Sequence, residues 1–202
     1  MFNVARAQNY RSQTDLSQVV PYEQVINSTT PEFGPTLYKL VTPHALDRAR
    51  THFGCPNMLG KSLLAVVRAE HWHVSGIDLE AGVDAAVPAP YFEKRLMFDE
   101  VMTLRPGRLI ISPVTLGLLQ DMGWYRVNYS GAQSWHWARN VGCNMVFTNC
   151  ATAWLTTSPS EALSNTELYQ FGCATSDQEG CSYDHRARSY CNLKQWDVVL
   201  EP

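Results

Sequence analysis

Two neighbouring stretches decide the fold: Tyr91-Phe-Glu-Lys-Arg-Leu-Met-Phe-Asp-Glu-Val-Met102-Thr103 and Ser112-Pro-Val-Thr-Leu-Gly-Leu-Leu-Gln-Asp-Met-Gly123. In the second stretch, Ser112 is a good N-cap, and the proline after it suits the first helical position, where no N–H is needed. Apolar residues then recur at three- and four-residue steps, and Gly123 stands where a helix-ending glycine is expected. We expect a buried turn that ends at Met102, a short loop, and a helix of about ten residues packed over the turn.

Both stretches resemble the C-terminal half of the catalytic domain of the leishmanolysins, a family of zinc metallopeptidases of the metzincin type. Three further pieces extend the resemblance in the same order: Ala49-Arg-Thr-His-Phe-Gly-Cys55, Trp137-Ala-Arg-Asn-Val-Gly-Cys143 and Gly180-Cys-Ser-Tyr-Asp-His185. The resemblance covers most of the chain from Val25 onward. It implies a mixed α+β fold, in which a partial metzincin C-terminal subdomain (the Met-turn and its packed helix) precedes a small disulfide-rich segment.

The resemblance also specifies where a zinc site should be. The family holds zinc with three histidines, two of them in a His-Glu-x-x-His helix whose glutamate polarises the zinc-bound water. By the resemblance, Met102 is the methionine of the Met-turn. The third histidine should stand eleven residues before it, and that position holds Tyr91. The chain contains no His-Glu-x-x-His. Zinc is thus the cofactor of the family, but we expect this chain alone to bind none and to have no catalytic residue.

Two functions from different classes stay open. The chain is either the C-terminal catalytic half of a leishmanolysin-like endopeptidase, acting on proteins or peptides, or a non-enzymatic secreted or cell-surface adhesion module that kept the fold. A weaker third option is a metal site at His71 and His73, which would share one face of a strand. We favour an ordinary His-Trp-His insert there, because nothing nominates a third ligand. His44 and His52 lie two helical turns apart, too far for one ion, so we expect helix-surface or capping roles.

Composition narrows the class of protein. The chain has 202 residues, 45% of them hydrophobic, which is enough to bury a core. Its net charge is −3 and only 17% of residues are charged, so a nucleic-acid partner is not expected. No run of eighteen apolar residues exists, and we find no transmembrane segment, signal peptide or anchor in the chain. Together with the cysteines, this favours a chain that begins in the middle of a longer protein.

We divide the chain into a partial catalytic domain, 1–126, and a cysteine- and aromatic-rich region, 127–202, whose end is cut short. Residues 61–76 have no counterpart in the family pattern, and we interpret them as an insertion, either genuine or an artefact of the gene model. Residues 1–35 read as irregular, apart from a short strand near 24–27. A strand at 36–42 and a helix that Thr42 opens and Gly54 ends should follow.

The six cysteines indicate disulfides in an oxidising compartment, hence an extracellular or cell-surface protein. None has the Cys-x-x-Cys spacing of a zinc or redox site. The candidates are Cys55, Cys143, Cys150, Cys173, Cys181 and Cys191. Six cysteines allow about fifteen complete pairings, and the resemblance implies Cys55 with Cys143.

Four other sequence features indicate possible local roles. Asn27 and Asn128 begin sequons and are candidate glycosylation sites. Trp135-His-Trp137 would suit a sugar-binding platform, but the resemblance favours core packing. His185 is expected to be a hydrogen-bonded structural histidine.

Overall fold

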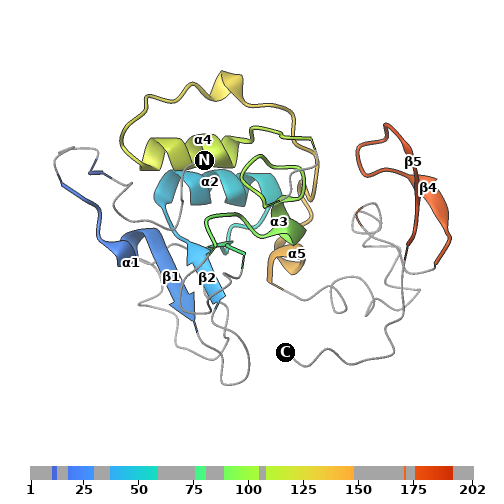
Figure 1. Cartoon of the computed structure of the whole chain (residues 1–202), viewed down its shortest axis with the longest axis horizontal. Coiled ribbons are helices and arrows are strands. Elements are labelled where there is room, and N and C mark those ends of the chain that lie inside the picture. Colours follow the sequence, from blue (N-terminus) through green and yellow to red (C-terminus); the bar gives the residue numbers. More distant parts are fainter. Residues whose placement is uncertain are drawn as a thin grey trace.

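The computed structural model describes residues 11–12, 18–29, 37–58, 76–80, 89–104, 108–147, 171 and 176–192 (Figure 1). The described part of the chain contains both helices and strands, so the mixed α and β character expected from the sequence is confirmed. The expected insertion at 61–76 lies outside the described residues except for Gly76, as do His71, His73, Cys150 and Cys173.

A three-stranded antiparallel sheet opens the fold. A single helical turn, α1 (Tyr22–Val25), leads into β1 (Ile26–Thr29), which pairs with β2 (Leu37–Leu40) and through it with β3 (Ile77–Asp78). The register sets Ile26 opposite Leu40 and Lys39 opposite Asp78, whose side chains form an ion pair. The expected strand at 36–42 is thus shorter. The strand expected near 24–27 begins at Ile26 instead, because that residue faces the buried Leu40.

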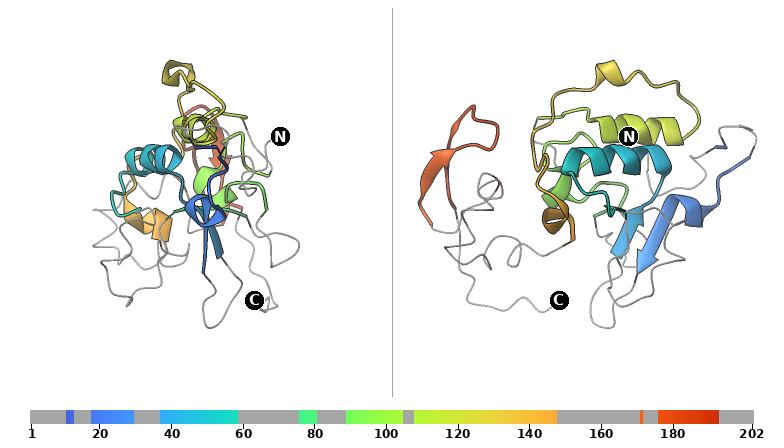
Figure 2. Two further views of the ribbon diagram at one scale, coloured as in Figure 1. Left: turned by 90° about the vertical axis from the view of Figure 1, so that its left-hand side faces the viewer. Right: turned by 180° about the vertical axis from the view of Figure 1, so that it is seen from behind.

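Two helices, α2 (Pro43–Phe53) and α4 (Pro113–Asp121), lie side by side, and in the view of Figure 1 both lie above the strands β1 and β2 (Figures 1 and 2). They approach closely at Gly117, where an added Cβ would lie 2.8 Å from the backbone nitrogen of Ala45. Helix α2 begins after Thr42 and ends at Gly54, whose φ of 64° is the left-handed conformation that glycine favours. Both boundaries were predicted from the sequence.

The cap of α2 differs from the expectation. Thr42 takes the N-cap position, but its side chain makes no capping hydrogen bond. Asp121 supplies the cap from the last turn of α4: its two carboxylate oxygens accept from the backbone amides of His44 (3.1 Å) and Ala45 (2.9 Å). The two helices are therefore joined by polar contacts as well as by packing.

The cap of α4 agrees with the prediction. Ser112 accepts hydrogen bonds from the amides of Val114 and Thr115, and Gly123 has a φ of 75° just beyond the helix. Two short helices, α3 (Lys94–Met97) and α5 (Cys143–Phe147), and a 3-10 turn, η3 (Tyr129–Gly131), complete this part of the fold. Among the described residues no helix is long and apolar enough to cross a bilayer.

One core runs through residues on both sides of position 126. Phe53 of α2 and Phe92 pack with Trp135, Trp137 and Met145 in the same buried cluster. Trp137 also donates its indole N–H to the carbonyl oxygen of Arg95 at 2.9 Å. The core-packing role expected for the Trp135-His-Trp137 sequence is thereby confirmed.

A disulfide joins Cys55, just after α2, to Cys143 at the start of α5, across 88 residues of chain. It is the pairing that the family resemblance implied. Cys191 is also disulfide-bonded.

Cys181, in contrast, has an exposed free thiol, which differs from its standing as a disulfide candidate. Cys181 ends β4 (Glu179–Cys181), which forms a hairpin with β5 (Arg188–Tyr190). The register of the hairpin sets Cys181 opposite Arg188, whereas Cys191 exchanges backbone hydrogen bonds with the segment 177–178.

Candidate functional site

The tight turn Asp99–Thr103 lies at the centre of the described fold, below α4. Its backbone closes where the amide of Thr103 donates to the carbonyl of Glu100 (3.2 Å), and the Thr103 hydroxyl donates to the same oxygen (2.9 Å). On one side, Val101 and Ile110 are joined by a backbone hydrogen bond of 2.9 Å. Met102 is 8% exposed and belongs to the core cluster. The turn at Met102 is therefore buried, as expected, and is held by hydrogen bonds within the turn and by the backbone bond to Ile110.

Glu100 holds this turn against α4, and sequence reasoning missed it. Its carboxylate is fully buried and accepts four hydrogen bonds: from the Met102 amide (2.6 Å), the Ser112 amide (3.2 Å), the Ser112 hydroxyl (2.9 Å) and the Thr115 hydroxyl. Burial raises the pKa of Glu100, and these four donors act in the opposite direction. The available signal was the N-cap Ser112, since a helix N-terminus attracts carboxylates.

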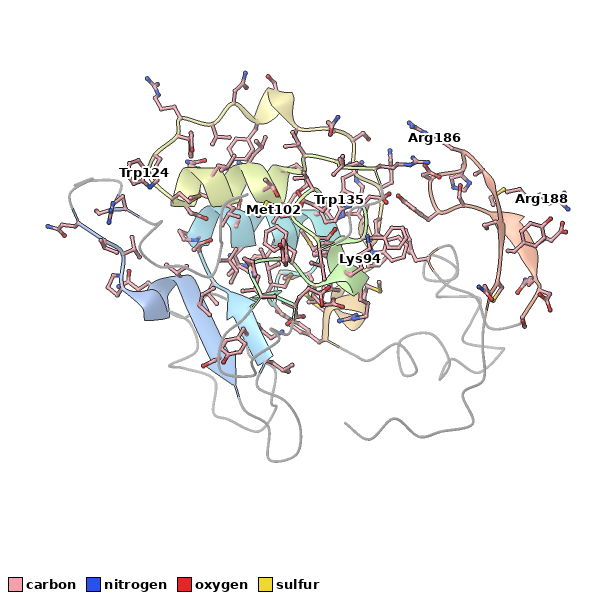
Figure 3. The ribbon with its side chains drawn as sticks, viewed as in Figure 1. Lys94, Met102, Trp124, Trp135, Arg186 and Arg188 are labelled. Atoms are coloured by element: carbon pink, nitrogen blue, oxygen red, sulfur yellow. A yellow bond between two sulfur atoms is a disulfide. The ribbon has the colours of Figure 1, made fainter. Side chains whose placement is uncertain are left out.

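Tyr91 lies in an extended segment that connects the sheet to the turn. The amide of Phe92 donates to the carbonyl of Met102 (3.0 Å), and the carbonyl of Tyr91 accepts from the amide of Glu80 (3.0 Å). Isolated bridges join Phe92 to Leu79 on one side and to Thr103 on the other. Tyr91 is half-buried. The segment of Tyr91 and the turn of Met102 are therefore neighbours through their backbones. Figure 3 marks the position of Met102 in the fold.

Two further carboxyl groups near the turn have altered acidity. Glu93 caps α3 by accepting from the amides of Arg95 (2.9 Å) and Leu96 (3.1 Å), and burial raises its pKa. Burial also raises the pKa of Asp99, against the opposing charges of Arg108 and Lys94. The capping of α3 explains the position of Glu93, whereas the Oδ2 of Asp99 is buried without a hydrogen-bond partner among the described residues.

The histidines of α2 occupy two different environments. The Nδ1 of His44 lies 2.6 Å from the carboxylate of Asp121, the side chain that caps the helix. A helix-surface or capping role was expected for His52 as well as for His44; the His52 ring is stacked on Trp135 with ring centroids 3.6 Å apart, and its Nε2 lies 2.8 Å from the carbonyl oxygen of Trp137. Burial lowers the pKa of His52 to about 4. The tryptophans of the C-terminal region cover this face of α2, which the local sequence did not indicate.

The donors around Met102 do not fit a zinc site. The carboxylate of Glu100 already accepts four hydrogen bonds. Tyr91, at the expected position of the third ligand, is a tyrosine, which is not among the usual zinc ligands. Within the described ranges, no three His, Cys, Asp or Glu side chains come together in a way that could hold a metal.

The candidate glycosylation sites lie on different elements. Asn128 is exposed, and its side-chain oxygen caps η3 by accepting from the amide (3.0 Å) and hydroxyl (2.8 Å) of Ser130. The backbone of Asn27 lies in β1, opposite Lys39. His185, at the turn of the β4–β5 hairpin, donates its backbone amide to the carbonyl of Ser182 (2.8 Å), and its side chain is exposed.

Comparison with known proteins places this geometry in context. The family model described as leishmanolysin, Peptidase_M8, matches residues 23–201. The chain is 28% identical to a leishmanolysin-like peptidase of Drosophila pseudoobscura pseudoobscura over 166 residues, which are 80% of this chain and 21% of that protein. It is 30% identical to a leishmanolysin-like peptidase of Caenorhabditis elegans over 115 residues, 56% of this chain and 15% of the relative.

A human relative, the ciliated left-right organizer metallopeptidase, is 28% identical over 139 residues, which cover 66% of this chain and 15% of that protein. The chain thus spans about a fifth of the length of the curated relatives it matches.

Proposed function

The chain belongs to the leishmanolysin family of peptidases, and from this premise we propose that it derives from a zinc metalloendopeptidase and supplies the Met-turn part of that fold. In this proposal, the region 1–126 corresponds to the C-terminal half of the catalytic domain, and 127–202 to the cysteine-rich region after it. The observation that carries the proposal is the buried turn at Met102, fixed to α4 by Glu100.

We further propose that this chain by itself neither holds catalytic zinc nor hydrolyses peptide bonds. A catalytic zinc site needs three protein ligands and a base that activates water. Tyr91 stands where the family has its third histidine, and the chain contains no His-Glu-x-x-His sequence. A phenol at one position, with no histidine helix, does not supply that set of ligands.

Protease assays of the purified chain test this proposal. With one equivalent of zinc, the protein should release no casein fragments that a chelator suppresses. A parallel digestion by an authentic zinc endopeptidase confirms that the assay detects such activity. Chelator-sensitive turnover that persists after contaminating proteases have been removed would show that the chain has a zinc site, and the proposal would be wrong.

A zinc titration of Tyr91→His examines the same proposal at the ligand position. One added histidine still leaves the site without the other two, so the variant should bind zinc no more tightly than wild type or Tyr91→Phe. Tight binding by the histidine variant alone would mean that further ligands already stand around Tyr91. That result would overturn the assignment of the site.

The second candidate is a non-enzymatic secreted or cell-surface module that binds other proteins. The disulfide between Cys55 and Cys143 supports the extracellular part of this candidate, because such bonds persist in oxidising compartments. Peptide mapping of secreted material without reductant tests whether the protein resides in an oxidising compartment. An intact Cys55–Cys143 pair supports an extracellular protein, and six free thiols contradict it.

A further inference from the structure

A cavity of about 460 Å³ lies between the loop 136–140 and the turn of the β4–β5 hairpin, apart from the Met102 turn. One wall carries His136, Arg139 and Asn140, and the other carries Tyr183, Asp184 and His185. Its volume lies within the range of small-molecule sites, about 300–1,000 Å³. Nothing in the proposed peptidase fold uses this cavity.

The loop wall is fixed in place by the end of α2. The amides of Asn140 and Gly142 donate to the carbonyls of His52 (2.9 Å) and Phe53 (2.8 Å), which a helix end would otherwise leave unpaired. Asn140 itself has a φ of 59°, a left-handed conformation that asparagine tolerates. The Cys55–Cys143 disulfide closes the same corner. Arg139 is thus presented from a rigid support.

The hairpin wall is equally organised. The Ser182 hydroxyl donates to the carboxylate of Asp184 (2.7 Å) and accepts from the amide of Ala187 (3.0 Å), which shapes the turn. The ring of Tyr183 packs edge-on against Trp137, at a centroid distance of 5.1 Å, and so attaches the hairpin to the core. Figure 3 shows Arg186 at the end of the hairpin nearer the body, with Arg188 on its far side.

The charges around the cavity are not balanced. The one acidic side chain that lines it, Asp184, already forms ion pairs with Arg108 and Arg186. Arg139 is exposed, and among the described residues it lies within ion-pair distance of no carboxylate. His136 and His185 add exposed rings on opposite walls; the Nε2 of His136 already lies 2.8 Å from the Ser134 hydroxyl, which leaves its Nδ1 for a ligand. This excess of donors and positive charge contrasts with the net charge of −3 of the whole chain.

We propose that this cavity binds a small molecule through a terminal oxyanion, which Arg139 grips while His136, Asn140 and His185 donate further hydrogen bonds. A guanidinium matches the planar fork of a carboxylate or phosphate, and such charge-assisted bonds are about twice as strong as neutral ones. The shared chemistry fits either a free inorganic anion or the C-terminal carboxylate of a short peptide. The preformed walls favour binding because little ordering is required.

Calorimetric titration of the full chain with two probes tests the proposal: inorganic phosphate, and an acetylated tripeptide with a free C-terminal carboxylate. The amidated tripeptide serves as the uncharged control. Tighter binding of the free acid than of both phosphate and the amide identifies a peptide terminus as the ligand. Tighter binding of phosphate identifies a free anion.

Variants then assign the binding to the cavity. Arg139→Gln should lower the affinity for the bound probe by at least about tenfold, since hydrogen bonds to charged groups contribute about 1.5–3 kcal/mol. His185→Asn should weaken it less; asparagine accepts the φ of 56° at that position, so the hairpin turn is kept. Arg126→Gln, an exposed arginine at the far end of α4 from this cavity, is the matched control and should bind as wild type does.

Three results would overturn the proposal: no heat of binding for either charged probe, equal affinity of wild type and Arg139→Gln, or equal losses in Arg139→Gln and Arg126→Gln. The thermal unfolding midpoint of each variant is measured alongside. Because both arginines are exposed, the midpoints should match, and a loss of binding is then assigned to the missing guanidinium.

Discussion

The carboxylate of Glu100 accepts a hydrogen bond from the backbone amide of Met102, 2.6 Å away, while its other oxygen faces the N-cap of α4. One buried side chain thereby fixes both the shape of the Met102 turn and the position of the helix above it. An apolar residue could fill the same space, but it would leave two backbone amides and two hydroxyls unpaired in the core. Such groups are expensive to bury without partners.

Replacing Glu100 by glutamine should therefore destabilise the protein strongly. All four hydrogen-bond partners of the carboxylate donate to it, so the side-chain NH2 group of glutamine would face an N–H or O–H donor where the carboxylate supplied an acceptor. We expect a loss of at least about 2 kcal/mol in the free energy of unfolding, measured in urea. Glu179→Gln, at an exposed site on β4, should change it by less than about 0.5 kcal/mol. Indistinguishable curves for the two variants would contradict this role of Glu100.

Asp121→Ala should destabilise α2 although the substitution lies in α4. The variant loses the acceptors of the His44 and Ala45 amides, and N-cap losses of this kind cost about 1–2 kcal/mol. Asp47→Ala, at an exposed site within α2 itself, is the control. If urea unfolding showed the larger effect for Asp47, the cap of α2 would have to come from elsewhere.

Gly117→Ala sets helix propensity against packing. Alanine favours an isolated helix by about 1 kcal/mol over glycine. Here its Cβ would lie 2.8 Å from the Ala45 nitrogen, and these backbone atoms yield only if α2 moves away from α4. Overpacking of this kind costs about 1–3 kcal/mol, so we expect net destabilisation by calorimetry. Gly131→Ala, where nothing lies within 4 Å of the added Cβ, should leave the melting temperature unchanged. A more stable Gly117→Ala protein would refute the close helix contact.

The sequence predicted those parts of the fold whose signals are local. Ser112 and Gly123 bound α4 because cap and terminator residues lie within a few positions of the helix they define. The same logic located both ends of α2. It failed for the cap itself, because Asp121 lies 77 residues from His44 and nothing in the local pattern connects them.

In the candidate site, too, some residues were predicted from the sequence and others are explained only by the tertiary structure. The buried turn at Met102 followed from a resemblance that covers consecutive residues. Glu100 was missed because a glutamate in a short polar run looks like a surface residue, and only the tertiary structure shows that four donors surround it. The burial of the His52 ring was missed for a similar reason: the tryptophan that covers it is far away in the sequence.

His52 should make the stability of the protein depend on pH between 6.5 and about 4. Burial lowers its pKa from 6.5 to about 4, so over that range the unfolded chain binds a proton that the folded protein does not. Excess proton binding by the unfolded state means that stability falls as the pH falls through this window, by up to about 3 kcal/mol in total. Above pH 6.5 the contribution is complete and constant.

Urea unfolding of wild type and His52→Phe from pH 7.5 to 4 measures the contribution of His52 to the pH dependence of the free energy of unfolding. Phenylalanine keeps an aromatic ring against Trp135 but cannot titrate, so its free energy of unfolding should fall less on acidification. The carboxyl groups of Glu93, Asp99 and Glu100, whose raised pKa values act in the opposite direction, are common to both proteins and cancel in the difference. Thr51→Ala, an exposed neutral neighbour in α2, should retain the full wild-type slope. Parallel curves for wild type and His52→Phe would mean that His52 is protonated equally in both states, and its burial under Trp135 would then have to be abandoned.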